Sequence, residues 1–149
     1  MNIYERLKAD HDNHRELMRR IVETEGESDE RKQLFDKLLQ DVESHAAAEE
    51  QTLYAELIES SEAQPQTRHS VTEHKQVSDL LTELQDIDMS SPQWLLTFKQ
   101  LQENLEHHMS EEEQDVFNLS KDVIDDGRAD KLAEKFDGRK QIKRQRLDD

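Results

Sequence analysis

Apolar residues recur at intervals of three and four along most of the chain, which is the spacing of one face of an α-helix. The stripes predict five helices, over residues 2–24, 29–59, 65–86, 92–120 and 128–145. Residues that break or start helices fall between them, namely Gly26, Pro65, Ser91-Pro92 and Gly127. Strand signals are missing, because β-branched residues are few and no run alternates between apolar and polar.

Short connections make successive helices antiparallel neighbours. The first four are therefore predicted to form an all-α, up-down-up-down antiparallel four-helix bundle, followed by a short C-terminal fifth helix. The predicted division is a bundle over 1–120 and a short helix with a charged tail over 121–149. The few apolar positions of the fifth helix, Leu132 and Phe136, allow it either to pack on the bundle or to reach for a partner.

A pattern of histidine and glutamate occurs twice within the predicted bundle. Its members, offset by 63 residues, are His11, His45 and Glu49 in the first copy and His74, His108 and Glu112 in the second. The same shift aligns Leu38 with Leu101 and Tyr54 with Phe117, so apolar register is repeated along with the polar pattern. The chain is thus interpreted as two copies of one helical hairpin, each burying its apolar face against the other.

All six repeated residues lie on inward stripes, where a polar side chain costs stability unless something satisfies it. In each copy the second histidine and the glutamate are four residues apart, on one helix face. The first histidine of each copy lies in the middle of a partner helix, so the bundle brings all six to one layer. Two metal ions could share them, each taking two histidines, with both glutamates bridging. The ligand types favour iron, with manganese or zinc less favoured.

Composition narrows the classes of function. The formal net charge of −16 argues against nucleic-acid binding, because phosphates would be repelled. The absence of cysteine excludes disulfides, thiolate zinc sites and iron–sulfur clusters. Neither a signal segment nor a run of roughly 20 apolar residues is seen, which predicts a cytoplasmic protein that binds no membrane.

A basic run stands out near the end of this acidic chain. Its members are Arg139, Lys140, Lys143, Arg144 and Arg146. The run is interpreted as a solvated helix end or tail, with contact to an acidic partner as the alternative.

His14 lies on the inner stripe one turn from His11, but its repeat counterpart is Val77. It is a candidate extra ligand, a group that hydrogen-bonds a ligand, or a proton donor near bound oxygen. The alternative is a boundary histidine at the bundle edge. His69 and His107 are expected to face outward.

Four residues next to the repeated pattern have expected structural roles. Glu50 and Glu113 follow the repeated glutamates and are expected to be solvated or hydrogen-bonded to a ligand histidine. Tyr54 and Phe117 are expected to fill the core above the site.

The motifs together resemble the hemerythrin/HHE cation-binding family over residues 1–120. The matching stretches are Asp10-His11, His45-Ala-Ala-Ala-Glu49-Glu50, Glu73-His74 and His108-Met-Ser-Glu-Glu112-Glu113. The resemblance implies a four-helix bundle holding a non-haem di-iron centre that reacts with oxygen or related small molecules. It carries the family's ligands over to the six repeated residues.

Two departures from the oxygen carriers of this family are visible. The carriers have an extra histidine one turn from the position of His74, where this chain has Ser70 and Ser78. Their fourth-helix carboxylate is an aspartate at plus five from the histidine, whereas Glu112 is at plus four from His108. The pattern looks more like bacterial di-iron proteins linked to nitric oxide and iron–sulfur repair, although their cysteine-bearing segment is missing.

Several functions follow as hypotheses. The first is reversible binding or sensing of O2 or NO at the di-iron centre. The second is an oxidoreductase that consumes NO, peroxide or O2 and takes electrons from a donor protein. Iron storage or donation, and a purely structural bundle, are the remaining alternatives.

Overall fold

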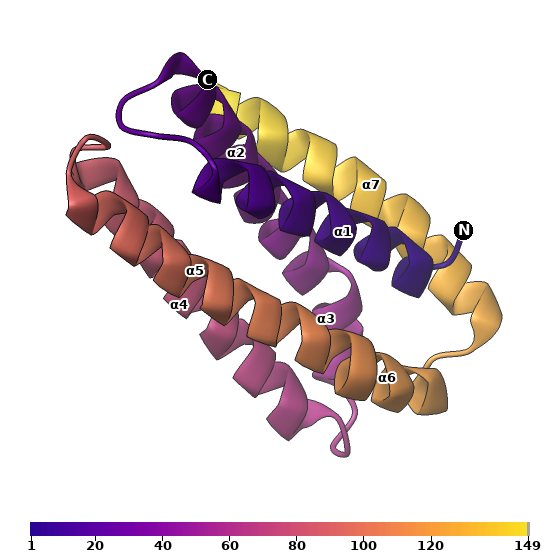
Figure 1. Ribbon diagram of the computed structural model, residues 1–149. Coiled ribbons are helices and arrows are strands. Elements are labelled where there is room, and N and C mark those ends of the chain that lie inside the picture. Colours follow the sequence, from indigo (N-terminus) through magenta and orange to yellow (C-terminus); the bar gives the residue numbers. More distant parts are fainter. Residues whose placement is uncertain (149) are drawn as a thin grey trace.

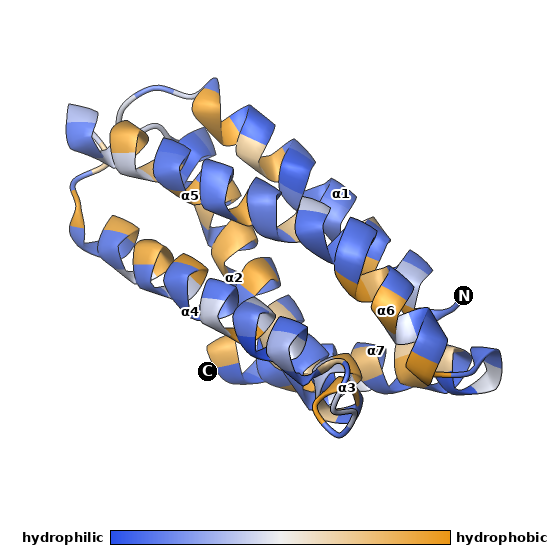
Figure 2. Ribbon diagram, turned by 90° about the horizontal axis from the view of Figure 1, so that it is seen from below, coloured by the Kyte–Doolittle hydropathy of each residue, from blue (hydrophilic) through white to orange (hydrophobic). Residues whose placement is uncertain are grey.

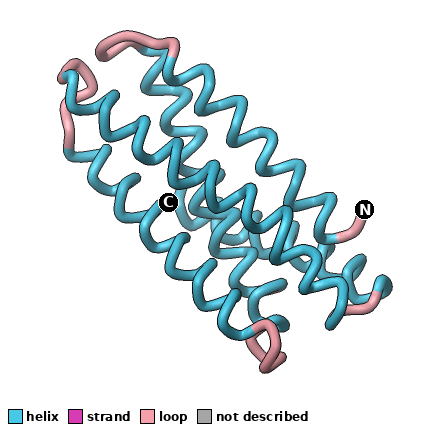
Figure 3. Tube along the Cα trace, turned by 60° about the horizontal axis from the view of Figure 1, so that its bottom comes forward, coloured by secondary structure: helices cyan, strands magenta, loops and turns pink. Residues whose placement is uncertain are grey.

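The structure is a computed structural model that describes residues 1–148, with short connections joining the helix ends (Figure 3). Its elements are α1 (Ile3–Val22), α2 (Asp29–Gln51), α3 (Leu53–Leu57), α4 (Gln64–Asp86), α5 (Pro92–Glu111), the π-helical turn η1 (Glu112–Val116), α6 (Phe117–Val123) and α7 (Asp126–Asp148). No strand occurs within residues 1–148. The predicted all-α bundle with a fifth C-terminal helix is confirmed.

Local sequence explains where the helices begin and end. The Asn2 side chain accepts a hydrogen bond from the backbone N–H of Glu5, and the Glu5 carboxylate accepts one from the N–H of Asn2, which forms a capping box. Ser28 and Ser91 cap α2 and α5 in the same way through their hydroxyl oxygens. Gly26 takes a φ of +55° in the first turn, a conformation that suits glycine.

Two of the predicted long helices are interrupted just after the glutamate of each repeat. Thr52 ends α2 with φ −120° and ψ −85°, and its hydroxyl donates to the carbonyl oxygen of Ala48 at 2.7 Å. The shift of 63 places Thr52 on Asp115, which lies inside η1. The prediction of a continuous helix over 29–59 is therefore wrong at Thr52, whereas 92–120 is helical throughout and changes only to π-type hydrogen bonding at η1. Hydrophobic periodicity reveals neither a single-residue break nor a π-turn.

Apolar side chains form two clusters at opposite ends of the bundle. One cluster surrounds Trp94 and Phe98. The other surrounds Tyr54 and Phe136 and includes the start of α1. The polar repeat lies along the helices between these two clusters. Figure 2 shows hydrophobic and hydrophilic residues alternating along every long helix, as amphipathic stripes require.

The C-terminal helix α7 packs along α1 and α2 (Figure 1). It has 23 residues and extends beyond the expected 128–145 at both ends, since Gly127 lies inside the helix rather than before it. Leu132 and Phe136 are buried, so the alternative in which this helix packs on the bundle is the one observed. The division of the chain at residue 120 stays a prediction. Among residues 1–148, no helix is both long and apolar enough to cross a membrane.

Candidate metal centre

The structure brings all six residues of the repeated pattern into one buried layer. They form two groups that could each hold a metal ion, and in each group the ligand atoms lie within 4.8 Å of one another. The groups are His11, His45, Glu49 and Glu112, and Glu49, His74, His108 and Glu112. The two glutamates are common to both groups, which is the arrangement expected of bridging carboxylates.

Short distances across the layer join the two repeats. His11 Nε2 lies 3.2 Å from Glu112 Oε1, and His74 Nε2 lies 3.1 Å from Glu49 Oε1. His74 Nε2 and His108 Nε2 are 3.1 Å apart. Each repeat therefore supplies a glutamate that approaches a histidine of the other repeat.

Every histidine in the layer is oriented by a carboxylate on its outer nitrogen. The pairs are His11 Nδ1 with Glu113 Oε2 (2.7 Å), His45 Nδ1 with Asp10 Oδ2 (2.8 Å), His74 Nδ1 with Glu50 Oε2 (2.9 Å) and His108 Nδ1 with Glu73 Oε1 (3.0 Å). The expected hydrogen bonding of Glu50 and Glu113 is confirmed. Sequence reasoning assigned no such role to Asp10 or Glu73, although each immediately precedes a repeated histidine.

This orientation fits a bound cation. With Nδ1–H donated to a carboxylate, a neutral imidazole presents the lone pair of Nε2 to the centre. Buried side-chain atoms without a hydrogen-bond partner include Nε2 of His11, Nε2 of His45, both oxygens of Glu49 and Oε1 of Glu112. Such a convergence of unsatisfied acceptors is costly in a protein interior unless a positive charge compensates it.

The pKa values of these side chains reflect the close approach of buried polar groups in the layer. Burial and the neighbouring Glu112 carboxylate raise the pKa of Glu49. Burial lowers the pKa of His45 to about 3. Burial alone would also lower the pKa of His11, but its contacts with Glu112 and Glu113 raise it to about 9. Ionising two adjacent buried carboxylates costs free energy unless a nearby cation compensates their repulsion.

Two aromatic residues flank the layer. Phe117 stacks on His11 with ring centroids 6.4 Å apart, as expected of a core residue above the site. Tyr54 stacks on His74 at 5.3 Å, but its hydroxyl also donates a hydrogen bond to Glu112 Oε2. The interpretation of Tyr54 as core filling was therefore incomplete. The available signal was the repeat itself, since Phe117 carries no hydroxyl at the matching position.

A cavity of about 460 Å³ opens beside the layer. Its lining includes His11, His45, His74 and His108 together with apolar residues such as Val77. His14 also lines it and is buried, with 1% of the residue exposed, so the boundary alternative is wrong. His14 Nε2 pairs with Asp41 Oδ2 at 2.6 Å, while Nδ1 has no hydrogen-bond partner among residues 1–148.

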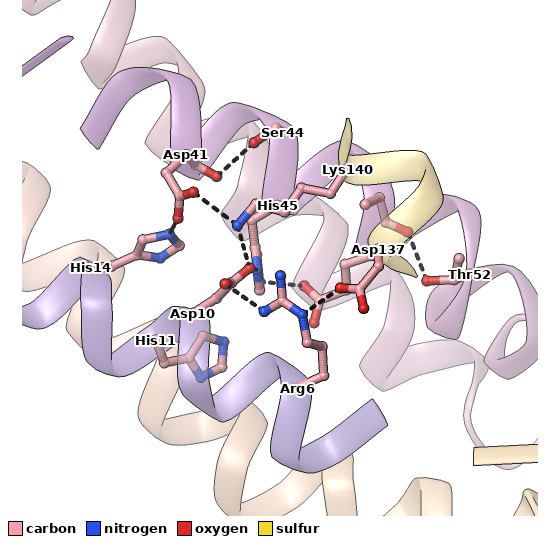
Figure 4. A network of polar contacts seen from close by, with 12 residues as sticks. Arg6, Asp10, His11, His14, Asp41, Ser44, His45, Thr52, Asp137 and Lys140 are labelled. Carbon is pink, nitrogen blue, oxygen red and sulfur yellow. Dashed lines mark hydrogen bonds and ion pairs between the residues drawn. The ribbon is translucent and has the colours of Figure 1, made fainter. Parts of the chain in front are cut away.

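Fixed cations surround the first-repeat side of the centre (Figure 4). Arg6 donates to Asp10 Oδ1 at 2.6 Å, and Lys140 of α7 lies 2.9 Å from Asp10 Oδ2 and 2.8 Å from Asp41 Oδ1. Arg144 also pairs with Asp41 at 3.1 Å. The interpretation of the basic run as a solvated tail is thus wrong for Lys140 and Arg144, because the acidic groups that they contact belong to this chain.

Comparison with known proteins agrees with this geometry. The family described as Hemerythrin HHE cation binding domain matches residues 2–120. A crystal structure of a hemerythrin HHE cation binding domain-containing protein from Mycobacterium kansasii is similar at 32% sequence identity. The similarity covers 97% of this chain and 88% of that chain, with a TM-score of 0.87. No curated protein matches the chain.

Proposed function

Because the chain belongs to the hemerythrin HHE cation-binding family, we propose that its buried layer holds two iron ions and binds or senses O2 or NO. The observation that carries this proposal is the convergence of unsatisfied acceptor atoms from both repeats on one point in the core. The proposed ligands are His11, His45, Glu49, His74, His108 and Glu112. His11 and His45 would hold one iron and His74 and His108 the other, and Glu49 and Glu112 belong to both groups.

The donor set supports iron. Imidazole and carboxylate ligands suit iron, while all-oxygen sites suit magnesium and calcium. Iron can also change its oxidation state, which zinc cannot. Manganese and zinc remain the less favoured occupants.

Residues around the cavity would control how a small molecule reaches the layer and how polar that molecule is. The adjoining cavity reaches the histidines from both repeats, so a small molecule can approach without moving a helix. Tyr54 holds one oxygen of Glu112, which fixes the orientation of that bridging carboxylate. The apolar lining, including Val77 and Leu105, favours an uncharged ligand over an ionic one.

A second candidate function is an oxidoreductase that consumes NO, peroxide or O2. The observation that favours it is His14, whose unpartnered Nδ1 belongs to a residue that lines the cavity beside the layer. This nitrogen can exchange a hydrogen bond with a reacting molecule. The reaction would need an electron-donor protein, and that partner and a cytoplasmic location stay predictions. Iron storage or donation is less favoured, because six buried ligands retain metal.

The test is metal content and spectrum of the full chain reconstituted with ferrous iron without oxygen. We expect about two irons per chain and new near-ultraviolet absorption after exposure to air. Reversal when oxygen is removed supports binding or sensing, whereas loss of added NO or peroxide over many turnovers supports the oxidoreductase. One iron or none, with no response to air or NO, would contradict the proposal.

A further inference from the structure

A second cluster of histidine and glutamate lies on the outer surface of the α4–α5 pair. Its members are His69 and Glu73, four residues apart on α4, and His107 and Glu111, four residues apart on α5. The histidine side chains are 53% and 70% exposed, as expected from the sequence, and the glutamate side chains are 10% and 18% exposed. Two outward histidines thus meet two largely buried carboxylates at a helix–helix seam.

The distances suit one shared cation. His69 Nε2 lies 3.2 Å from Glu111 Oε1 and 3.5 Å from Glu73 Oε2. His107 Nε2 lies 3.1 Å from Glu111 Oε2 and 3.7 Å from Glu73 Oε2. A tetrahedral zinc ion with ligands at 2.0–2.2 Å separates neighbouring ligand atoms by about 3.4 Å. Ligand atoms of His69, Glu73 and Glu111 lie within 4.8 Å of one another, whereas His107 is outside this mutual spacing and approaches the same two carboxylates from α5.

The pseudo-symmetry of the fold gives an independent argument. The shift of 63 places Glu73 on Asp10 and His69 on Arg6. Asp10 has two fixed cations, the Arg6 guanidinium at 2.6 Å and the Lys140 ammonium at 2.9 Å. Within residues 1–148, Glu73 has no lysine or arginine as an ion-pair partner and faces only histidines. Arginine and lysine side chains therefore neutralise Asp10 in the first repeat, whereas within residues 1–148 none does so for Glu73 in the second.

We propose that His69, Glu73, His107 and Glu111 form a third metal site, for an exchangeable divalent cation of the zinc class. Two imidazoles and two carboxylates without thiolate suit Zn²⁺ and its neighbours Ni²⁺ and Cu²⁺. A hollow of about 290 Å³ beside the cluster, lined in part by Glu73 and His107, leaves it open to solvent. The bound cation occupies the place that Arg6 and Lys140 take in the first repeat.

The third site touches the inner centre through one carboxylate. Glu73 presents Oε2 to His69 and His107, while its Oε1 lies 3.0 Å from His108 Nδ1. A cation on Oε2 withdraws charge from Oε1 and weakens the hydrogen bond that it accepts from His108. This consequence rests on the proposed inner centre, whereas the existence of the third site does not.

The experiment is equilibrium dialysis of the full chain against Zn²⁺ at pH 7.5, with bound metal counted by elemental analysis. His69→Gln/His107→Gln is compared with the unchanged chain, and Glu103→Gln, an exposed acid beside the same hollow, is the control for general attraction to negative charge. We expect the double variant to bind one Zn²⁺ fewer and the control to bind the same number. Equal binding by the double variant would overturn the proposal.

A variant that lacks both inner glutamates distinguishes metal binding at this site from binding at the inner one. In Glu49→Gln/Glu112→Gln, with helicity checked by circular dichroism, we expect one Zn²⁺ to remain and to disappear when His69 and His107 are also replaced. With Co²⁺ as the probe, the remaining ion should show the intense visible absorption of tetrahedral coordination. If this background binds as many ions as the unchanged chain, the inner centre fails while the outer site stands. If it folds and binds none, the outer site fails.

Discussion

The two halves of the proposed centre have the same residue types in different surroundings. In the first half, the carboxylate that orients His45 is held by Arg6 and by Lys140 from α7, and Phe136 packs edge-on against the His45 ring at 5.3 Å. In the second half, His108 relies on Glu73, whose other neighbours are the exposed histidines of the surface cluster. The duplicated sequence accounts for the ligands, and α7 accounts for the asymmetry.

The different surroundings of the two halves are expected to affect how fast a metal ion leaves more than whether it binds. Ligand type and spacing decide whether a metal binds, and these are shared by both halves. The rate at which a metal leaves depends on how firmly the outer carboxylates are held and on access to solvent. Glu50, which orients His74, has a side chain that is 39% exposed, whereas its counterpart Glu113, which orients His11, is 19% exposed. We therefore expect the second half to exchange metal faster than the first.

The largest effect is expected from a substitution that affects both halves of the proposed centre at once. Glu112→Gln takes one shared carboxylate from both metal groups and leaves a neutral amide against the inward nitrogens. We expect metal content to fall from two ions per chain to none that survive gel filtration. The measurement is elemental analysis after reconstitution with ferrous iron.

The control for that change is Glu113→Gln, the adjacent residue, which pairs with Nδ1 of His11 and with Arg15. Replacing a carboxylate that only orients a ligand histidine lowers metal affinity by about 10- to 100-fold. Both ions should therefore still bind at high metal concentration. If Glu112→Gln retained one ion in one half, the two halves would not share this glutamate.

The second prediction compares the matched carboxylates Asp10 and Glu73. Asp10→Asn removes the ion pairs of Asp10 with Arg6 and Lys140, which keep Asp137 and Asp41 as partners, so we expect it to lower the free energy of unfolding by about 2 kcal/mol. Glu73→Gln removes no fixed ion pair and should cost about 1 kcal/mol. Urea unfolding of the metal-free chain measures both. Equal losses would show that α7 contributes nothing to the asymmetry.

The third prediction tests the helix directly. Lys140→Met keeps the aliphatic packing of the side chain but removes its ion pairs with Asp10 and Asp41. We expect metal to leave the first half about 10-fold faster, which corresponds to about 1.4 kcal/mol in the barrier. The measurement is stopped-flow transfer of metal to a chelator. Arg139→Met removes a positive charge from an exposed position of the same helix and should leave the rate unchanged.

The smallest expected effect is a difference in proton release. At pH 7, His11, with its pKa raised to about 9, is protonated without metal, whereas His45, with its pKa lowered to about 3, is neutral. A metal that binds the first half therefore displaces a proton from His11 and none from His45, so its affinity increases as the pH rises toward 9. Calorimetry in buffers of different ionisation enthalpy counts the protons. Release from His45 instead would reverse this assignment.

The sequence was sufficient to predict what depends on periodicity and repetition. Stripes at three and four spacing predicted the four-helix bundle, and the offset of 63 predicted that both repeats meet in one layer. That these six residues bind metal stays a prediction. The break at Thr52 and the π-turn at Glu112–Val116 were missed, because the apolar stripe continues across both.

Contacts between distant segments were harder to predict. Lys140 was expected to be solvated because it belongs to a basic run, but its aspartate partners lie 130 and 99 residues away in sequence. His69 and His107 were correctly expected to face outward, yet their convergence on Glu73 and Glu111 depends on how α4 and α5 pack. A single sequence identifies the residues of such clusters, but it does not show that they lie close together in the folded chain.

The order of the elements, with α7 after both repeats, has a consequence for biosynthesis. Chains are made from the N-terminus, and domains begin to fold as they emerge. The three residues of the second repeat, on α4, α5 and η1, are complete before Phe136 and Lys140 have been translated. The layer can therefore assemble on the nascent chain while its first-repeat side is still uncovered. Because the 23 residues of α7 are translated after the other helices, the covering of that side follows the synthesis of both repeats.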